Sequence, residues 1–231
     1  MSPMFFDPTF IILIPAVIFS LYAQMKVKMT FERYSRVSSR SGFTGAQIAE
    51  KLLLENGIND VRVERTNTRL GDHYDPRKKV LRLSPEVYGG SSIAAVGVAA
   101  HETGHAIQHD TGYFPLELRA SLVPVAQFGS TAAFPILFVG LLLGSPLLAQ
   151  IGVYAFLGVV LFQLVTLPVE YNASARAVAL LQSTGFVHGE EAEHTKKVLN
   201  AAALTYLAGA LAAVLSLLRL VILSRMFGGD D

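Results

Sequence analysis

Long runs without charged residues dominate the pattern of hydrophobic and polar positions along this chain. A helix needs about 20 apolar residues to cross a bilayer, and the run at residues 120–169 is long enough for two such helices. A Gly-Ser-Pro turn at residues 144–146 lies where a hairpin between two spans would fall. Buried helices of a soluble protein are the alternative, but they would need a very large core for 231 residues. The pattern predicts four transmembrane helices, at about residues 8–25, 125–144, 149–168 and 198–219.

Basic residues that follow the first uncharged run predict how the chain is oriented. Five Lys and Arg residues lie within residues 26–40 against a single acid, whereas only Asp7 lies on the other side of the run. Because cytoplasmic flanks are enriched in Lys and Arg, we expect an outside N-terminus and a cytoplasmic segment at residues 26–119. Arg219 and Arg225, in a tail that would then lie outside, argue mildly against this orientation. The first run lacks the basic flank of a signal peptide, so we interpret it as an uncleaved anchor.

The predicted organisation therefore alternates between membrane and cytoplasm. It comprises a transmembrane anchor (residues 1–25), a cytoplasmic α+β lobe (26–119), a transmembrane helical hairpin (120–169), a cytoplasmic segment (170–197) and a transmembrane helix with its tail (198–231). The expected fold class is mainly α: a membrane protein of about four transmembrane helices with one small lobe.

Short periodic segments predict the secondary structure of the lobe. Thr44 and Gln47 form a capping-box pattern ahead of a helix. Residues 61–65 and 79–83 alternate like strands, and turn residues at 71–76 between them indicate a β-hairpin or a small sheet.

Two more helices are predicted at the end of the lobe. Ser84 followed by Pro85 is typical of a helix start, with the serine as N-cap. Ser91 or Ser92 would open the next helix, which runs to about His109.

Composition narrows the chemistry of the chain. Charged residues make up 16% of it, below the roughly 25% of average globular proteins, which supports a lipid bilayer as its environment. The absence of Cys excludes disulfides and thiolate metal ligands. The net charge is +1 and no basic cluster is interleaved with aromatic residues, so no nucleic-acid partner is expected.

The stretch AAHETGHAIQH at residues 99–109 places ionisable groups within an apolar run. On a helix, His101 and His105 project from one face, one turn apart, where two imidazoles can share a zinc ion. Glu102 completes the H-E-x-x-H pattern of metalloproteases, in which the glutamate acts as general base. The alternative is a solvated polar face, but the flanking alanines and Ile107 predict a buried helix instead.

A catalytic zinc ion needs a third protein ligand, and the topology offers Glu170. This residue is the first charged one after the long uncharged run, and two spans would return it to the membrane face of the two histidines. A carboxylate there could instead simply mark the membrane interface. The rival ligands are the other four histidines of the chain, His73, His109, His188 and His194.

These motifs resemble those of a known family. HETGHAIQH, two predicted spans and then PVEYNASARA resemble the YugP-like family of neutral zinc metallopeptidases, and so does the segment DHYDPRKKVLRLSPEVY ahead of the zinc motif. The order of these features is similar to that of the HtpX and CAAX prenyl proteases, which are membrane gluzincins. The resemblance covers nearly the whole chain. It implies a zincin-like lobe, Glu102 as the base and zinc ligands at His101, His105 and Glu170.

Two details of the expected site stay open. In HtpX-type proteases an Asp four residues after the ligand Glu orients a zinc histidine, whereas this chain has Ser174 there, and Asn172 could substitute. The transition state of peptide hydrolysis also needs a donor for its oxyanion. Candidates for that donor are Arg176, His188, Tyr171 and Tyr206.

We therefore expect a membrane-embedded, zinc-dependent endopeptidase that holds one zinc ion per chain and uses a zinc-activated water with Glu102 as general base. Its substrate would be a peptide or a membrane protein, and a role in membrane-protein quality control would fit. The alternative is a zinc-binding membrane scaffold with little proteolytic activity, although a scaffold needs no base at Glu102. A homo-oligomer or a membrane-protein partner would suit the small residues of the last span, Ala208, Gly209 and Ala212. The expected location is the bacterial cytoplasmic membrane, with the active site facing the cytoplasm.

Overall fold

The computed structural model describes residues 8–68 and 71–227, and predictions that fall on other residues, such as Asp7, lie outside this part. The chain forms two compact units. We call the first the helical unit; it comprises Met1–Tyr22, Leu118–Leu167 and Thr205–Asp231. The second, the mixed unit, comprises Ala23–Glu117 and Pro168–Leu204.

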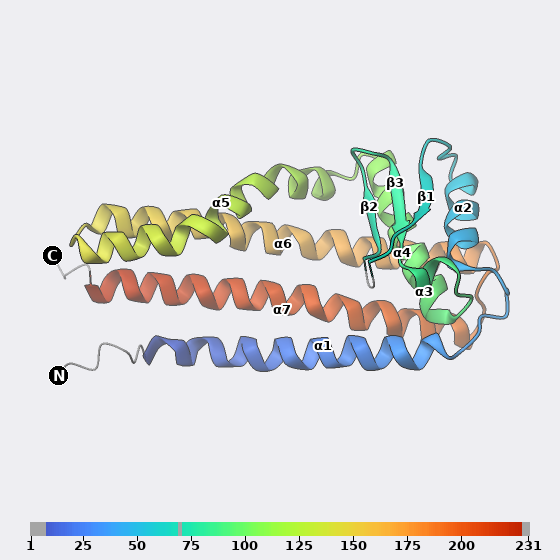
Figure 1. The fold of residues 1–231 in the computed structure, drawn as a ribbon, viewed down its shortest axis with the longest axis horizontal. Coiled ribbons are helices and arrows are strands. Elements are labelled where there is room, and N and C mark those ends of the chain that lie inside the picture. Colours follow the sequence, from blue (N-terminus) through green and yellow to red (C-terminus); the bar gives the residue numbers. More distant parts are fainter. Residues whose placement is uncertain (1–7, 69–70, 228–231) are drawn as a thin grey trace. The chain divides into compact units, whose positions relative to one another are not determined.

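Most of the described chain is helical, as Figure 1 shows. The helices are η1 (Pro8–Leu13), α1 (Ile14–Ser35), α2 (Gly45–Glu55), α3 (Pro85–Tyr88), α4 (Ile93–Asp110), α5 (Phe114–Leu142), α6 (Pro146–Ser183) and α7 (Glu190–Phe227). The strands are β1 (Arg62–Arg65), β2 (His73–Asp75) and β3 (Val80–Leu83). The predicted mainly helical fold with a small sheet is confirmed.

Within the described residues, four helical segments are long and apolar enough to cross a membrane, namely Pro8–Ser35, Phe114–Leu142, Pro146–Ser183 and Glu190–Met226. Their number agrees with the prediction, but each begins before its predicted range or ends after it. In α6 the helix continues past Glu170 to Ser183, and its later turns bury Ala173, Ala177 and Leu181 in the mixed unit. Hydropathy identifies only the apolar part of such a helix, whereas packing of an amphipathic face stabilises the remainder.

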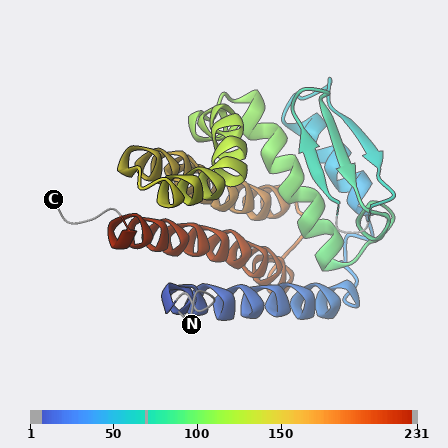
Figure 2. The same ribbon diagram turned by 60° about the vertical axis from the view of Figure 1, so that its left-hand side comes forward.

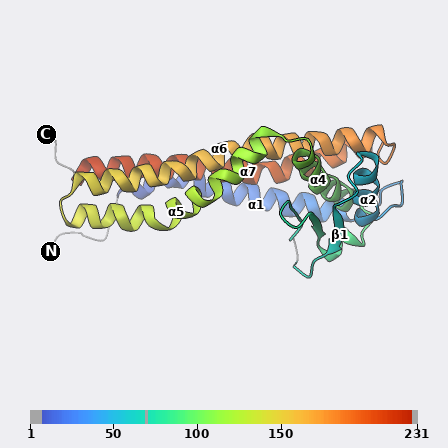
Figure 3. The same ribbon diagram turned by 90° about the horizontal axis from the view of Figure 1, so that it is seen from above.

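Apolar side chains of α5, α6 and α7 pack together in the helical unit. Leu137 of α5, Phe156 of α6 and Leu220 of α7 belong to one buried cluster. Helices α5 and α6 lie side by side as a hairpin (Figure 3). Gly144 in their connection has a φ of +60°, a conformation that favours glycine, and α6 begins at Pro146. The predicted Gly-Ser-Pro turn is therefore confirmed.

The sheet of the mixed unit has the strand order β1-β3-β2. Strand β1 pairs with β3 in parallel, and β2 pairs with β3 antiparallel. A hairpin between residues 61–65 and 79–83 is therefore wrong, since parallel strands need a crossover. The hairpin joins β2 to β3 instead, and its turn begins at Asp75, whose carboxylate accepts hydrogen bonds from the backbone N–H groups of Arg77 and Lys78 at 3.0 and 3.1 Å.

Helices α2 and α4 pack on each other and on the sheet, as Figure 2 shows. Leu81 and Leu83 of β3 lie fully buried against Ala49 of α2 and Ala99 of α4. The capping box predicted at the start of α2 is confirmed, because both of its hydrogen bonds form. Thr44 and Gln47 make both bonds of the capping box, at 3.3 and 2.9 Å.

The two later helix starts differ from one another. Ser92 caps α4 by accepting a hydrogen bond from the backbone N–H of Ala95 at 3.2 Å, as predicted. Ser84 precedes α3 but makes no side-chain cap, because its hydroxyl donates to Asp72 at 3.0 Å. This bond ties the start of β2 to the end of β3.

Candidate metal centre

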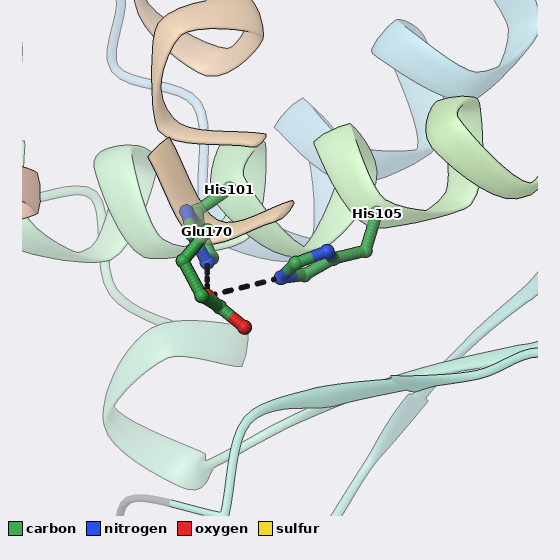
Figure 4. A group of neighbouring side chains, drawn as sticks. All are labelled: His101, His105 and Glu170. Atoms are coloured by element: carbon green, nitrogen blue, oxygen red, sulfur yellow. Dashed lines mark hydrogen bonds and ion pairs between the residues drawn. The ribbon is translucent and has the colours of Figure 1, made fainter. Parts of the chain in front are cut away.

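Helices α4 and α6 bring three predicted ligands together within the mixed unit. His101 and His105 lie one turn apart on α4, and Glu170 approaches them from α6 (Figure 4). The Oε2 atom of Glu170 lies 3.2 Å from Nε2 of His101 and 3.4 Å from Nε2 of His105. One ligand atom from each residue falls within 4.8 Å of the others, which is a separation that a shared metal ion can bridge.

A glycine makes this approach of the two helices possible. A Cβ atom on Gly104 would lie only 2.7 Å from the carbonyl oxygen of Ala173 and 3.2 Å from its Cα. Any side chain at this position would therefore push α6 away from α4. Because Gly104 lies between the two histidines in sequence, this close approach of the helices is also the place where the ligands meet.

The ligand cluster is largely shielded from water. Glu170 is 2% exposed and His105 is 9% exposed. Burial acts to lower the pKa of His105, but its hydrogen bond to Glu170 and the nearby charge of Glu102 outweigh burial and raise that pKa. Two imidazole nitrogens and one carboxylate oxygen are a donor set that suits zinc, so the residues present fit this metal.

The outer nitrogen of each imidazole has a hydrogen-bond partner. Nδ1 of His101 lies 3.1 Å from the hydroxyl oxygen of Ser174, and Nδ1 of His105 lies 3.0 Å from Oε1 of Gln108. If each Nδ1 carries the proton, it donates to these oxygens and leaves Nε2 free as a ligand atom. Of the two residues considered from sequence for orienting a zinc histidine, Ser174 is the one that lies next to His101.

Gln108 extends the support of His105 into a wider network. Its Nε2 atom donates to the carbonyl oxygen of Val169 at 2.8 Å and to Oδ1 of Asn172 at 3.0 Å. Oδ1 of Asn172 also accepts a hydrogen bond from Nε of Arg176 at 2.8 Å. The amide orientation of Gln108 is consistent throughout, because its oxygen accepts from the imidazole and its nitrogen donates to two oxygens.

Gln108 is a residue of the site that was not predicted from the sequence. The signal that could have found it is its spacing, because it follows His105 by three positions and so shares its helix face. It is also fully buried, which a glutamine tolerates only when its amide is hydrogen-bonded.

The segment ahead of the zinc motif interacts electrostatically with Glu102. Burial raises the pKa of Asp72, and the negative charge of Glu102 raises it further, whereas hydrogen bonds from Ser84 lower it. Asp72 accepts from both the backbone N–H and the hydroxyl of Ser84, at 2.7 and 3.0 Å. These two bonds fix the turn that begins the DHYDPR segment, whose Asp72 is exposed to the charge of the predicted base.

The rival histidine ligands lie apart from the cluster. His73 lies 2.8 Å from the carbonyl oxygen of Gly71 through Nδ1, and His109 lies 2.9 Å from the hydroxyl of Tyr74. His194 packs against the ring of Tyr34, and His188 is exposed in the connection between α6 and α7. None of the four belongs to the group of potential ligands found among the described residues.

The four oxyanion donors proposed from sequence lie in different surroundings. Arg176 is bonded to Asn172 and lies 6.0 Å from the centre of the Tyr113 ring. Tyr171 is 46% exposed, His188 is exposed, and Tyr206 belongs to the helical unit. Arg176 therefore belongs to the hydrogen-bond network behind His105.

Replacing Gln108 with Ala should weaken metal binding without removing a ligand. Loss of a hydrogen bond behind a metal-bound histidine typically lowers metal affinity by about 10- to 100-fold. Zinc affinity would be measured by competition with a chelating indicator. Thr103→Val is a matched control, because Thr103 is equally buried on α4 but bonds to the carbonyl oxygen of Ala99 at 2.9 Å. Equal losses in both variants would contradict a specific role for Gln108.

Comparisons with known proteins agree with this donor set. Residues 9–225 match the profile of a family described as "Putative neutral zinc metallopeptidase". The chain is 50% identical over 211 residues to "Putative membrane protease YugP" of Bacillus subtilis (strain 168), a match that covers 91% of this chain and 93% of that protein. No solved structure matches the chain. A match over this length places the chain in the family of neutral zinc metallopeptidases.

Proposed function

We propose that this protein is a membrane-embedded zinc endopeptidase, with His101, His105 and Glu170 as zinc ligands and Glu102 as general base. The observation that carries the proposal is the convergence of a buried carboxylate from α6 on two imidazoles of α4, next to a further carboxylate. Membership of the zinc metallopeptidase family and the four candidate spans support it.

Bound zinc would supply a Lewis acid that polarises the scissile carbonyl and acidifies the attacking water. The chain's own residues set the geometry around it. Ser174 and Gln108 orient the two imidazoles, and the short contact at Gly104 keeps Glu170 against them. These contacts fix the ligands before substrate arrives, so little reorganisation is needed during the reaction.

Glu102 is suited to move the proton. It is 9% exposed, and in the described part of the chain its carboxylate forms no hydrogen bond or ion pair. The carboxylate can therefore accept a hydrogen bond from the attacking water. As the water oxygen bonds to the carbonyl carbon, one water proton passes to Glu102. The C–N bond then breaks, and Glu102 returns that proton to the leaving amine.

The substrate class and location follow from the surroundings of the site. The relative in Bacillus subtilis is named as a membrane protease, and four apolar helices would keep this chain in a bilayer. We infer that the site faces the cytoplasm, because the basic residues 26–40 follow the first span. Membrane proteins in quality control are the substrates that this placement favours.

The test is metal analysis combined with a cleavage assay on the full chain in detergent. We expect about one zinc ion per chain, cleavage of casein, loss of cleavage after treatment with 1,10-phenanthroline, and recovery after zinc is added back. Protein that holds no zinc after gentle purification, or cleavage that persists without metal, would contradict the proposal.

A further inference from the structure

A second feature of the mixed unit is a groove between α1 and α7, with a volume of about 390 Å³. Lys26, Met29, Thr30 and Arg33 line it from α1. They follow the i, i+3, i+4, i+7 spacing of a single helix face. Their side chains therefore form one continuous wall of the groove, with a basic group at each end.

Helix α7 supplies the opposite wall with the same spacing. Lys197, Asn200, Ala201 and Leu204 line the groove from this side. Lys26 is the first charged residue after the uncharged run 8–25, and Lys197 is the last before the run 198–218. Where apolar spans end, lipid headgroups begin, so the groove lies at the depth of the headgroups.

The charges in this groove are unbalanced. None of its lining residues is acidic. In the described part of the chain, no carboxylate lies within 4.0 Å of Lys26, Arg33 or Lys197, and Arg33 instead lies over the ring of Tyr34 at 5.5 Å. Three cations around one groove repel each other, and a bound anion would relieve that repulsion.

The groove also has an apolar side. Met29 is 68% exposed, Met25 on the preceding turn is 59% exposed, and Leu204 lines the opposite wall. A ligand that matches both parts has a phosphate for the basic residues and Asn200, and a hydrocarbon chain for the apolar ones. A free phosphate compound would leave the apolar surface uncovered.

We propose that this groove binds the headgroup of an anionic phospholipid, with Lys26, Arg33 and Lys197 around its phosphate and an acyl chain along α1. Unlike diffuse attraction to a negative membrane surface, this binding depends on which basic residues line the groove. The site is separate from the metal cluster, so its test does not depend on proteolytic activity.

The experiment compares two double variants that remove the same charge. Lys26→Gln/Lys197→Gln alters the groove, whereas Lys28→Gln/Lys196→Gln removes two exposed lysines of the same helices that do not line it. Full-length protein in detergent is titrated with phosphatidylglycerol or phosphatidylcholine, and the bound fraction is measured by native mass spectrometry. Melting temperatures establish that each variant is folded.

We expect wild type to prefer phosphatidylglycerol, and the groove variant to bind it roughly 30-fold more weakly. The control variant should lose less than about threefold. Equal losses in the two variants, no preference for the anionic lipid, or an unchanged groove variant would overturn the proposal. Glycerol phosphate serves as a further probe: binding as tight as that of phosphatidylglycerol would show a free phosphate site instead and would also overturn it.

Discussion

Glu102→Gln should retain zinc and lower kcat/KM for peptide hydrolysis by about 10²- to 10⁴-fold. Glutamine has the shape of glutamate but cannot accept a proton from water at neutral pH, so the variant removes one chemical step and little else. Because Glu102 forms no hydrogen bond or ion pair in the described part of the chain, the substitution breaks no contact that supports the fold.

The measurement pairs metal content with the rate of casein cleavage in one preparation. Glu50→Gln is the control, because Glu50 is an exposed carboxylate on α2 and its loss should leave both quantities unchanged. Full activity in Glu102→Gln would remove the proposed base. Loss of zinc together with activity would instead indicate that Glu102 takes part in binding the metal.

Sequence spacing was sufficient to predict the part of the site that lies on one helix. His101 and His105 share a face of α4 because four positions make about one turn. Glu170 could be predicted as well, because two spans of similar length return the chain to the same side. Both inferences depend only on helix geometry and membrane thickness.

Contacts between helices could not be predicted from sequence spacing. The bond of Gln108 to Val169 depends on how α6 packs against α4, and so does the choice of Ser174 as the partner of His101. Gly104 is a further example. That this position requires glycine becomes clear only when the carbonyl oxygen of Ala173 is seen beside it.

The small sheet shows a second limit. Strand β2 has three residues, and His73, Tyr74 and Asp75 lack the apolar alternation that marks a strand in sequence. Its neighbours Gly71, Asp72 and Pro76 are typical of turns, so the sequence predicts a turn at this place. Pairing with β3 stabilises β2, and such pairing is not encoded locally.

Glu170→Gln tests the second large prediction, which is that metal binding requires this carboxylate. We expect zinc affinity to fall by more than about 100-fold, beyond the effect of residues that act only behind the ligands. Glutamine preserves the volume of a side chain that is 3% exposed, so loss of metal cannot be attributed to a cavity. Two imidazoles alone would still bind zinc weakly, because they keep their partners Ser174 and Gln108.

A second buried carboxylate of the mixed unit separates loss of a ligand from loss of stability. Glu191 is 7% exposed, and its Oε1 atom accepts a hydrogen bond from the backbone N–H of Arg40 at 2.8 Å, away from the metal cluster. Glu191→Gln should lower the free energy of unfolding by about 1 to 3 kcal/mol, because a charged acceptor is lost, and should keep full zinc affinity. Glu170→Gln should instead lose zinc affinity, because it removes a ligand and not only a structural contact. If both variants retained zinc equally, Glu170 would be a structural partner of the histidines, and the third ligand would have to come from elsewhere.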